Sequence, residues 1–164
     1  MKGPTRAILL MMGLGCAGLI GAALYLQHAE NLLPCPLCVV QRVAYWLVGV
    51  LALLALLHDS PVALRRGYGA FMALAAFIGA AVALRQAWLI RHPEAFECGI
   101  SPEERFLNAL PIARWWPAMF EANGDCADAA WTFASLYLPD WSALCLLLLG
   151  GLAIHVLLAE RVVR

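Results

Sequence analysis

The sequence predicts an all-α integral membrane protein, a four-helix bundle with one long loop that contains short helices. Three observations predict this fold: an apolar composition, four long apolar segments and an uneven distribution of basic residues. Of the 164 residues, 63% are hydrophobic and 13% are charged, whereas soluble globular domains are about 45–50% apolar and about 25% charged. The net charge is zero and the basic residues are dispersed, which argues against nucleic-acid binding.

Four apolar segments are candidates for spanning helices, because crossing a hydrocarbon core of about 30 Å takes about 20 helical residues. The second segment reaches this length only if its helix begins near Pro36 and includes Gln41 and Arg42. Lys2 and Arg6 precede the first segment, but its apolar stretch is longer than that of a signal peptide, so we expect a retained helix. The expected helices cover residues of about 7–27, 36–57, 67–90 and 140–160.

Basic residues near helix ends favour the cytoplasm, and here they gather at one end of the expected bundle. They are Lys2, Arg6, Arg65, Arg66, Arg161 and Arg164. Both termini and the loop at about 58–66 are therefore predicted to be cytoplasmic. The loops at about 28–35 and 91–139 then lie on the exported side, and the chain 1–164 forms a single membrane domain.

The long loop has signals for short helices of its own. Ser101-Pro102-Glu103-Glu104 has a capping serine, a proline at the first helical position and a glutamate three residues after the cap. A tryptophan-rich apolar stretch with Trp115 and Trp116 follows Pro111. Because tryptophan favours the membrane interface, this stretch is expected to lie on the membrane surface or over the helix ends.

Most of the cysteines fall on the exported side, where disulfides form and persist in a bacterium. Cys16 and Cys145 fall within membrane segments, where cysteine usually behaves as a small hydrophobe, and neither is assigned a role. The cysteines on the exported side are Cys35, Cys38, Cys98 and Cys126.

The motif Cys35-Pro36-Leu37-Cys38 is the strongest candidate for chemistry. Two cysteines at this spacing can close a reducible disulfide, and the start of a helix stabilises a thiolate through backbone N–H groups and the helix dipole. Arg42 follows Cys38 by one helical turn on the same face. An arginine just inside the bilayer is costly and indicates function; it could stabilise a Cys38 thiolate or bind a carbonyl oxygen of a quinone. No hydride-carrier or flavin motif is present, so a membrane quinone is the expected acceptor of electrons.

Other interpretations of these residues remain open. The motif also occurs in zinc sites and structural disulfides, and Arg42 could extend to the lipid headgroups. A zinc site is disfavoured, because Cys98 and Cys126 are too far apart in sequence to form a second short knuckle. No metal is therefore expected. A c-type haem is disfavoured because Val39, not histidine, follows Cys38. Cysteines both in the loop and at the membrane favour a relay of electrons by thiol–disulfide exchange.

Four stretches of the sequence together resemble the DsbB family, bacterial disulfide bond formation protein B. They are Pro34-Cys35-Pro36-Leu37-Cys38-Val39-Val40-Gln41-Arg42, Leu84-Arg85-Gln86-Ala87-Trp88-Leu89, Asn123-Gly124-Asp125-Cys126-Ala127 and Pro139-Asp140-Trp141. The resemblance implies a four-helix protein of the bacterial inner membrane. It implies a thiol:quinone oxidoreductase that reoxidises a periplasmic DsbA-type thiol oxidase, with ubiquinone or menaquinone as acceptor.

The resemblance also implies roles for the cysteines. The reduced partner would attack Cys98 of a Cys98–Cys126 disulfide, and the electrons would then pass to the Cys35–Cys38 pair. Cys35 would exchange with the loop cysteines, and Cys38 as a thiolate would contact the quinone, which Arg42 would help to hold.

Two further residues, Arg85 and Gln86, are candidate quinone contacts by the same resemblance. Many members of the family carry histidine at the position of Gln86. Glutamine can supply a hydrogen bond there, but it cannot titrate as histidine does.

Two other functions stay open at the level of the sequence. The first is a non-catalytic membrane module whose outer loop is held by structural disulfides and binds an exported partner. The second is a quinone-linked enzyme of the vitamin K epoxide reductase type, in which the motif lies on a different helix. The position of Cys35 and Cys38 at the start of the second helix favours the thiol:quinone oxidoreductase.

Overall fold

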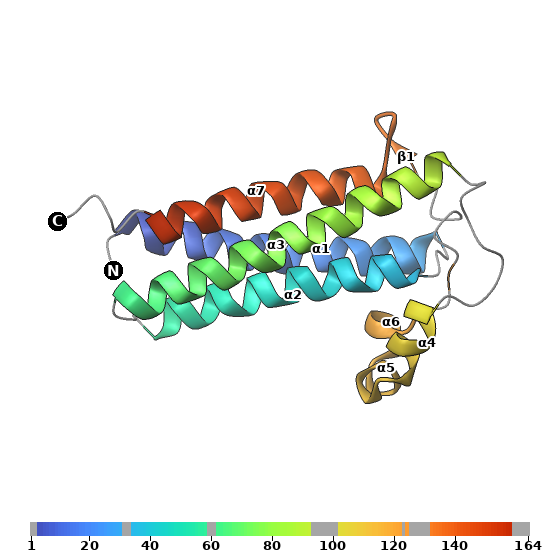
Figure 1. Cartoon of the computed structure of the whole chain (residues 1–164), viewed down its shortest axis with the longest axis horizontal. Helices are drawn as coiled ribbons and strands as arrows, with labels where there is room; N and C mark the ends of the chain where they lie inside the picture. The colour runs from blue at the N-terminus through green and yellow to red at the C-terminus, as the bar shows by residue number, and fades with distance from the viewer. Residues whose placement is uncertain are drawn as a thin grey trace.

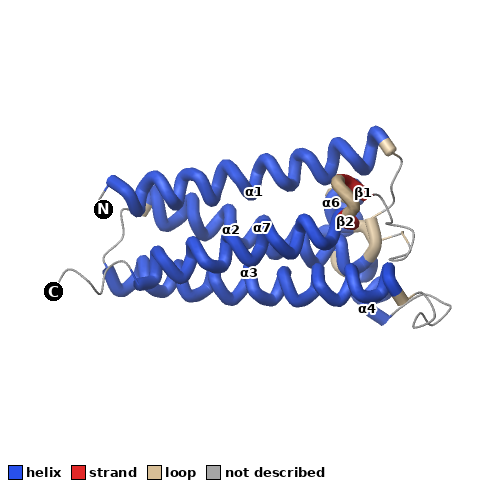
Figure 2. The backbone as a smooth tube through the Cα atoms, turned by 90° about the horizontal axis from the view of Figure 1, so that it is seen from above, coloured by secondary structure: helices blue, strands red, loops and turns tan. Residues whose placement is uncertain are grey.

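The computed structural model describes residues 3–30, 34–58, 62–92, 102–122, 124 and 132–158. The expected site residues Cys98 and Cys126 lie outside the described residues. Four long helices, α1 (Gly3–Ala29), α2 (Pro36–Leu57), α3 (Val62–Arg91) and α7 (Leu138–Leu158), run side by side (Figures 1 and 2). The start of α1 and the end of α7 lie at the same end of the bundle (Figure 1).

The predicted fold class is confirmed. Each of the four long helices is long and apolar enough to cross a membrane, and short helices lie in the long loop. Large apolar side chains such as Leu14, Phe71 and Leu148 are exposed on the outside of the bundle. Lipid is the solvent that such a surface requires, since it would be costly in water.

The start of α2 agrees with the prediction, whereas α3 starts earlier than predicted. Proline occupies the first turn of α2, where its missing N–H is no loss, and Cys35 is the N-cap residue. The third long helix, α3, begins at Val62, five residues before the expected start, and it includes Arg65 and Arg66. The apolar run that predicts this helix is therefore shorter than the helix, because alanine, leucine and arginine all favour helix outside the apolar stretch as well.

The core lies between neighbouring helices in the order α1, α2, α3, α7. Small residues of α3, among them Ala76, Ala80 and Ala83, are buried along one face. Such residues allow helix backbones to approach closely, which is how membrane helices gain packing contacts. Larger side chains fill the remaining core, including Leu9, Met12, Val48, Met72, Leu146 and Val156.

Gly79 has the closest neighbours of the described glycines. A Cβ atom at this position would lie 2.6 Å from Ala44 Cβ on α2 and 3.1 Å from Leu146 Cδ1 on α7. Gly79 therefore sets how closely α3 packs against both of its neighbours, and no larger residue fits without a shift of the helices.

A small hairpin precedes α7 and was not expected from the sequence. Strand β1 (Thr132–Phe133) pairs antiparallel with β2 (Leu136–Tyr137), so that Thr132 faces Tyr137. The two turn residues, Ala134 and Ser135, have φ angles of 51° and 66°, as a tight turn between two-residue strands requires. Glycine or asparagine usually marks such turns, and neither is present here.

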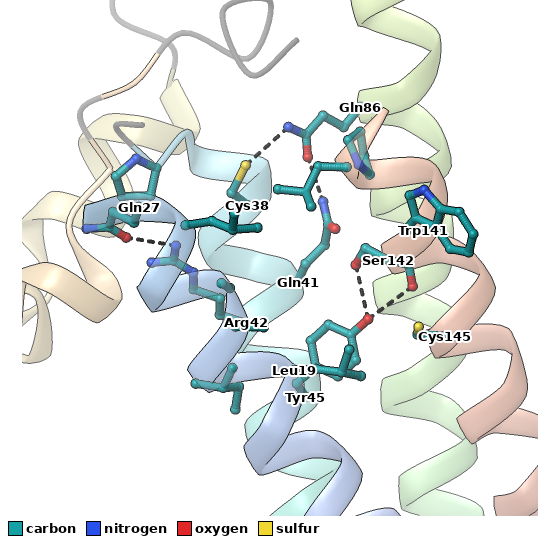
Figure 3. A pocket seen from close by; sticks show the side chains of 17 residues that line it. Leu19, Gln27, Cys38, Gln41, Arg42, Tyr45, Gln86, Trp141, Ser142 and Cys145 are labelled. Atoms are coloured by element: carbon teal, nitrogen blue, oxygen red, sulfur yellow. Dashed lines mark hydrogen bonds between the residues drawn. The ribbon is translucent and has the colours of Figure 1, made fainter. Parts of the chain in front are cut away.

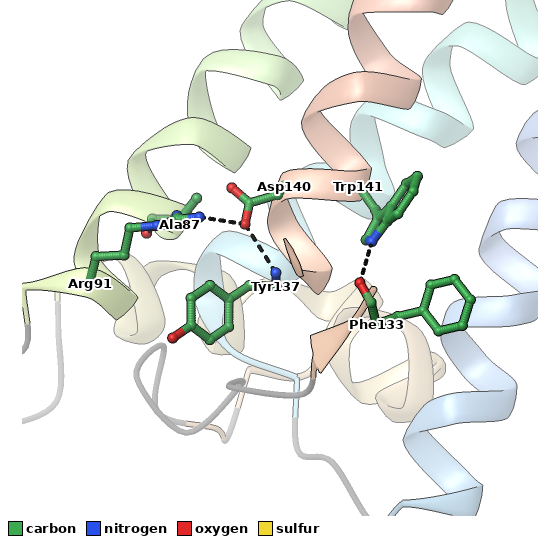
Figure 4. A network of polar contacts seen from close by, with 6 residues as sticks. All are labelled: Ala87, Arg91, Phe133, Tyr137, Asp140 and Trp141. Carbon is green, nitrogen blue, oxygen red and sulfur yellow. Dashed lines mark hydrogen bonds and ion pairs between the residues drawn. The ribbon is translucent and has the colours of Figure 1, made fainter. Parts of the chain in front are cut away.

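Polar contacts fix this hairpin and the end of α3 to the start of α7 (Figure 4). Asp140 Oδ2 accepts hydrogen bonds from Arg91 Nη2 at 2.8 Å and from the Tyr137 backbone N–H at 3.0 Å. Arg91 also lies 5.1 Å from the centre of the Tyr137 ring. The Trp141 indole N–H donates to the Phe133 carbonyl at 3.1 Å. These contacts join the two ends of the long loop at the bundle.

The packing at Gly79 predicts that Gly79→Ala destabilises the protein by about 1–3 kcal/mol, the usual cost of overpacking a filled core. The new methyl group would overlap the Ala44 side chain, which has no flexible end that can move aside. Thermal unfolding of the purified protein in detergent measures the loss.

Gly21→Ala is the matched control, since a Cβ atom at Gly21 meets nothing within 4 Å. This change should keep or increase stability, because alanine favours a helix by about 1 kcal/mol over glycine. Equal stability of Gly79→Ala and Gly21→Ala would contradict the close packing of α3.

Candidate functional site

The end of the bundle where α2 begins contains a cavity of about 180 Å³, lined by α1, α2, α3 and α7 (Figure 3). One part of its wall is apolar and comes from α1, with Leu19, Ile20 and Leu26. The polar groups come mainly from the other helices. They are Gln27, Cys38, Gln41, Arg42, Tyr45, Gln86 and Ser142. The cavity thus combines an apolar wall with a few polar groups, as sites for small organic molecules usually do.

Cys35 and Cys38 lie together at the first turn of α2. Their sulfur atoms are 2.8 Å apart, and the Cys38 backbone N–H donates to Cys35 Sγ at 3.3 Å. Cys35 is fully buried, whereas Cys38 is partly exposed and lines the cavity. The positive end of the helix dipole favours negative charge on either sulfur. Cys38 is the cysteine of this pair that a molecule in the cavity can reach.

Gln86 places its side-chain amide against both sulfurs. Its Nε2 donates to Cys35 Sγ at 3.2 Å and to Cys38 Sγ at 3.1 Å. Its Oε1 accepts a hydrogen bond from Gln41 Nε2 at 2.7 Å. Both glutamines are buried, and Gln86 is only 1% exposed. An amide in this position can stabilise charge on sulfur, since hydrogen bonds to an ionised acceptor are stronger than neutral ones.

Arg42 is buried one turn below Cys38, with 8% of its surface exposed. Its Nη2 donates to Gln27 Oε1 at 2.8 Å, and its Nη1 donates to the Ala118 carbonyl at 3.1 Å. An arginine that extends to the headgroups would be exposed, so this burial argues against that interpretation. The guanidinium joins α1, α2 and the loop, and it also lines the cavity.

Three short helices of the loop, α4 (Pro102–Ala109), α5 (Pro111–Trp115) and α6 (Pro117–Phe120), lie beside this end of α2 (Figure 1). The Trp116 ring meets the Trp46 ring of α2 edge-on, with 6.3 Å between the ring centres. Trp115, its neighbour, is 87% exposed. The tryptophan-rich stretch therefore packs one of its tryptophans against the bundle and directs the other outward.

The chain returns from the loop close to the cysteine pair. The Gly124 backbone N–H donates to the Pro34 carbonyl at 3.1 Å. Pro34 immediately precedes Cys35, and Gly124 lies two positions before Cys126 in the sequence. This contact fixes one point of the loop beside the start of α2.

The structure thus brings together four of the expected site residues, Cys35, Cys38, Arg42 and Gln86. Arg85 is exposed and does not line the cavity. Among the residues that the structure describes, no group of three or more histidine, cysteine or acidic side chains could hold a metal ion.

Several functional candidates were missed in the sequence. Gln41 had a signal, since it is a polar residue within an apolar helix next to Arg42. Tyr45 and Ser142 had none, although the Tyr45 hydroxyl contacts the Ser142 carbonyl at 3.1 Å across the cavity wall. Cys145, which was assigned no role, also lines the cavity.

Comparison with known proteins gives one consistent result. Residues 5–156 match the family DsbB, disulfide bond formation protein DsbB. Disulfide bond formation protein B of Nitrosospira multiformis is 68% identical over 158 residues, which cover 96% of this chain and 94% of that protein. The protein of the same name from Nitrosomonas europaea is 61% identical, with 90% and 92% covered. That of Aromatoleum aromaticum is 42% identical, with 96% and 95% covered.

The contact between Trp116 and Trp46 predicts that Trp116→Ala loosens the loop helices from α2. Trypsin should then cut after Arg105 and Arg114 about three- to tenfold faster, since an aromatic pair contributes about 0.5–1.5 kcal/mol beyond its buried area. Cleavage rates of the protein in detergent, followed by mass spectrometry, measure this.

Trp115→Ala is the matched control, because it removes the exposed tryptophan that precedes Trp116 in the chain. Its cleavage rate should stay within twofold of the wild type. If both variants were cut at the same rate, the loop helices would not be held by Trp116.

Proposed function

The chain belongs to the DsbB family of disulfide bond formation proteins, and on this basis we propose that it reoxidises a periplasmic DsbA-type thiol oxidase with a membrane quinone. The observation that carries this proposal is the position of Cys38. Its sulfur lies at the start of a membrane helix, on the wall of a cavity that also contains a buried arginine. A dithiol in that place can exchange with other thiols and can also reach an acceptor dissolved in the bilayer.

The cavity suits a quinone in its chemistry. A quinone has a flat ring with carbonyl oxygens and an apolar tail. The Arg42 guanidinium is a donor of the kind that carbonyl oxygens accept, and the apolar wall from α1 suits the ring and tail. Ubiquinone and menaquinone share these features, and we propose that one of them is the acceptor.

The proposed reaction begins in the loop. A thiolate of the reduced partner attacks Cys98 of a Cys98–Cys126 disulfide, and a mixed disulfide forms while Cys126 leaves as a thiolate. The second thiol of the partner then displaces Cys98, so that the partner leaves oxidised and the loop cysteines hold two electrons. A loop thiolate then attacks Cys35 of a Cys35–Cys38 disulfide, and Cys38 leaves as a thiolate. The other loop thiol displaces Cys35, so that the Cys98–Cys126 disulfide forms again and both electrons are held by Cys35 and Cys38. The contact of Gly124 with Pro34 supports this last exchange.

The final step takes place at the cavity. Cys38, as a thiolate, gives an electron pair to the quinone, and the Cys35–Cys38 disulfide forms again. Two protons accompany the two electrons, so that one partner dithiol and one quinone become one disulfide and one quinol. Arg42 would face the negative charge that develops on the quinone oxygen, where a fixed cation is most effective.

We propose that the whole chain, residues 1–164, forms one membrane domain with both termini in the cytoplasm and the active cysteines in the periplasm of a bacterium. The positions of the basic residues support this orientation. The start of α1 and the end of α7 also lie at the end of the bundle opposite the start of α2 (Figure 1), where Cys35 is the N-cap residue. Labelling of cysteines in whole cells with a membrane-impermeant reagent tests the orientation; labelling only from the cytoplasm would reverse it.

The alternative of structural disulfides is less well supported. A disulfide that only braces the loop does not require a buried amide on both sulfurs or a cavity beside one of them. No contact among the described residues favours an enzyme of the vitamin K epoxide reductase type.

Cys38→Ser is expected to abolish quinone reduction by the purified protein when reduced DsbA is the electron donor. Serine has no sulfur that could give electrons to the quinone or form the disulfide with Cys35. Loss of quinone absorbance measures turnover, with ubiquinone and menaquinone analogues tested in parallel.

Cys16→Ala is the control for this prediction, because Cys16 is a buried core residue away from the cysteine pair. It should keep at least half of the wild-type turnover. Cys98→Ser should separately prevent the mixed disulfide with the partner. No turnover in folded wild-type protein, with either quinone, would support structural disulfides instead.

Arg42→Ala is expected to raise the KM for quinone by about tenfold or more, since a hydrogen bond to a charged group is commonly worth this much. The KM for the reduced partner should change by less than twofold, because that protein is expected to meet Cys98 in the loop. Arg42→Lys should give an intermediate KM for quinone, because lysine keeps the positive charge but lacks the planar set of donors of the guanidinium. Unchanged kinetics in both variants would show that Arg42 has a structural role only, through its contacts with Gln27 and Ala118.

A further inference from the structure

The amide of Gln86 has two ends, and only one of them can stabilise charge on sulfur. Its N–H groups donate to both sulfurs of the cysteine pair, at 3.2 and 3.1 Å. If the amide were turned by half a rotation, its oxygen would face the sulfurs instead. A carbonyl oxygen repels a thiolate, because both carry negative charge. The function of Gln86 at this place therefore depends on the direction in which its amide points.

The neighbouring Gln41 lies where it can fix that direction. Its Nε2 donates to Gln86 Oε1 at 2.7 Å, the shortest side-chain hydrogen bond of this cluster (Figure 3). Turning the Gln86 amide alone, while Gln41 keeps its orientation, would place two N–H groups against each other and break this bond. Both side chains are buried, so water does not readily replace the lost partner, and an unsatisfied buried donor is costly.

We propose that Gln41 is a positioning residue for the redox centre: it orients the Gln86 amide so that neutral N–H donors face the sulfur pair. Gln86 in turn stabilises the thiolate that forms on Cys38 or Cys35. The two glutamines form one unit, and loss of either has the same result at the sulfurs. The effect on turnover rests on the proposed function, but the effect on sulfur reactivity does not.

Gln86 contacts the two sulfurs, a partner different from the expected quinone. The resemblance suggested a contact between Gln86 and the quinone, whereas in the structure its donors are directed to the two sulfurs. Gln86 also lines the cavity. A test must therefore separate an effect on sulfur from an effect on quinone binding.

The test is the rate at which iodoacetamide alkylates Cys38 in the reduced protein, in detergent and without quinone or partner. Mass spectrometry of the peptide that contains Cys38 reports this rate. Gln86→Met should slow alkylation about three- to tenfold. Loss of one hydrogen bond to a charged group reduces the fraction of Cys38 that is present as thiolate by about tenfold. The less stabilised thiolate is a better nucleophile, and this offsets part of the loss in rate. Gln41→Met should slow alkylation to a similar extent.

The double variant Gln41→Met/Gln86→Met provides the decisive comparison. If Gln41 acts only through Gln86, the double variant should be no slower than Gln86→Met alone, within twofold. Effects that multiply would show that the two glutamines act independently, and the proposal would be wrong. Gln41→Asn, whose amide is too short to reach Gln86 Oε1, should behave as Gln41→Met and replaces it if that variant does not fold.

Tyr68→Phe is the matched control. It removes the hydrogen bond between Tyr68 and His58, 3.1 Å long, which joins the end of α2 to α3 far from the sulfurs. Alkylation of Cys38 should stay within twofold of the wild type. An equal slowing in Tyr68→Phe would mean that any weakening of the α2–α3 contact affects Cys38, and this would overturn a specific role for Gln41.

Turnover is measured on the same variants. Normal alkylation together with a raised KM for quinone in Gln86→Met would make Gln86 a quinone contact and refute its role at the sulfurs. If the wild type showed no quinone turnover while the alkylation pattern held, the proposed function would fail and the positioning by Gln41 would stand.

Discussion

The first turn of α2 is the constraint on which the rest of the site depends. Proline there and Cys35 as N-cap fix where the helix begins. Once that point is fixed, helical geometry places Cys38 one turn further along and Arg42 one turn below it. All of these groups then lie at the end of a bundle that is otherwise apolar. In such surroundings each buried polar group needs a partner within the protein, because lipid offers none.

This demand explains polar residues on the other helices. Gln27 at the end of α1 and the Ala118 carbonyl in the loop satisfy Arg42, and Gln86 on α3 satisfies the sulfurs. The ends of the loop are joined to each other through Arg91 and Asp140, and Gly124 within the loop contacts Pro34. The sulfur chemistry of one helix thus determines which polar side chains the neighbouring elements carry at this level.

The helices, the motif and Arg42 could be predicted from the sequence, because each is a local pattern of length, spacing or charge. The contacts between helices could not be predicted from such local patterns. Gln41 and Gln86 are 45 residues apart, and nothing local indicates that they meet. The choice between Arg85 and Gln86 was open for the same reason, although a signal existed. Gln86 continues the stripe of small residues that includes Gly79 and Ala83, at the i, i+4, i+7 spacing of a buried helix face.

The use of neutral amides beside the sulfurs has a physical reason in a redox cycle. The sulfur pair is uncharged as a disulfide and carries negative charge as a thiolate, so its surroundings must tolerate both states. A second buried cation next to the pair would be left without a counter-charge whenever the disulfide forms, and an unpaired buried charge is strongly destabilising. An amide loses much less in that state, because its hydrogen bond to sulfur only weakens. Two glutamines joined to each other can therefore favour the thiolate without destabilising the disulfide, while Arg42 has partners of its own, Gln27 and the Ala118 carbonyl.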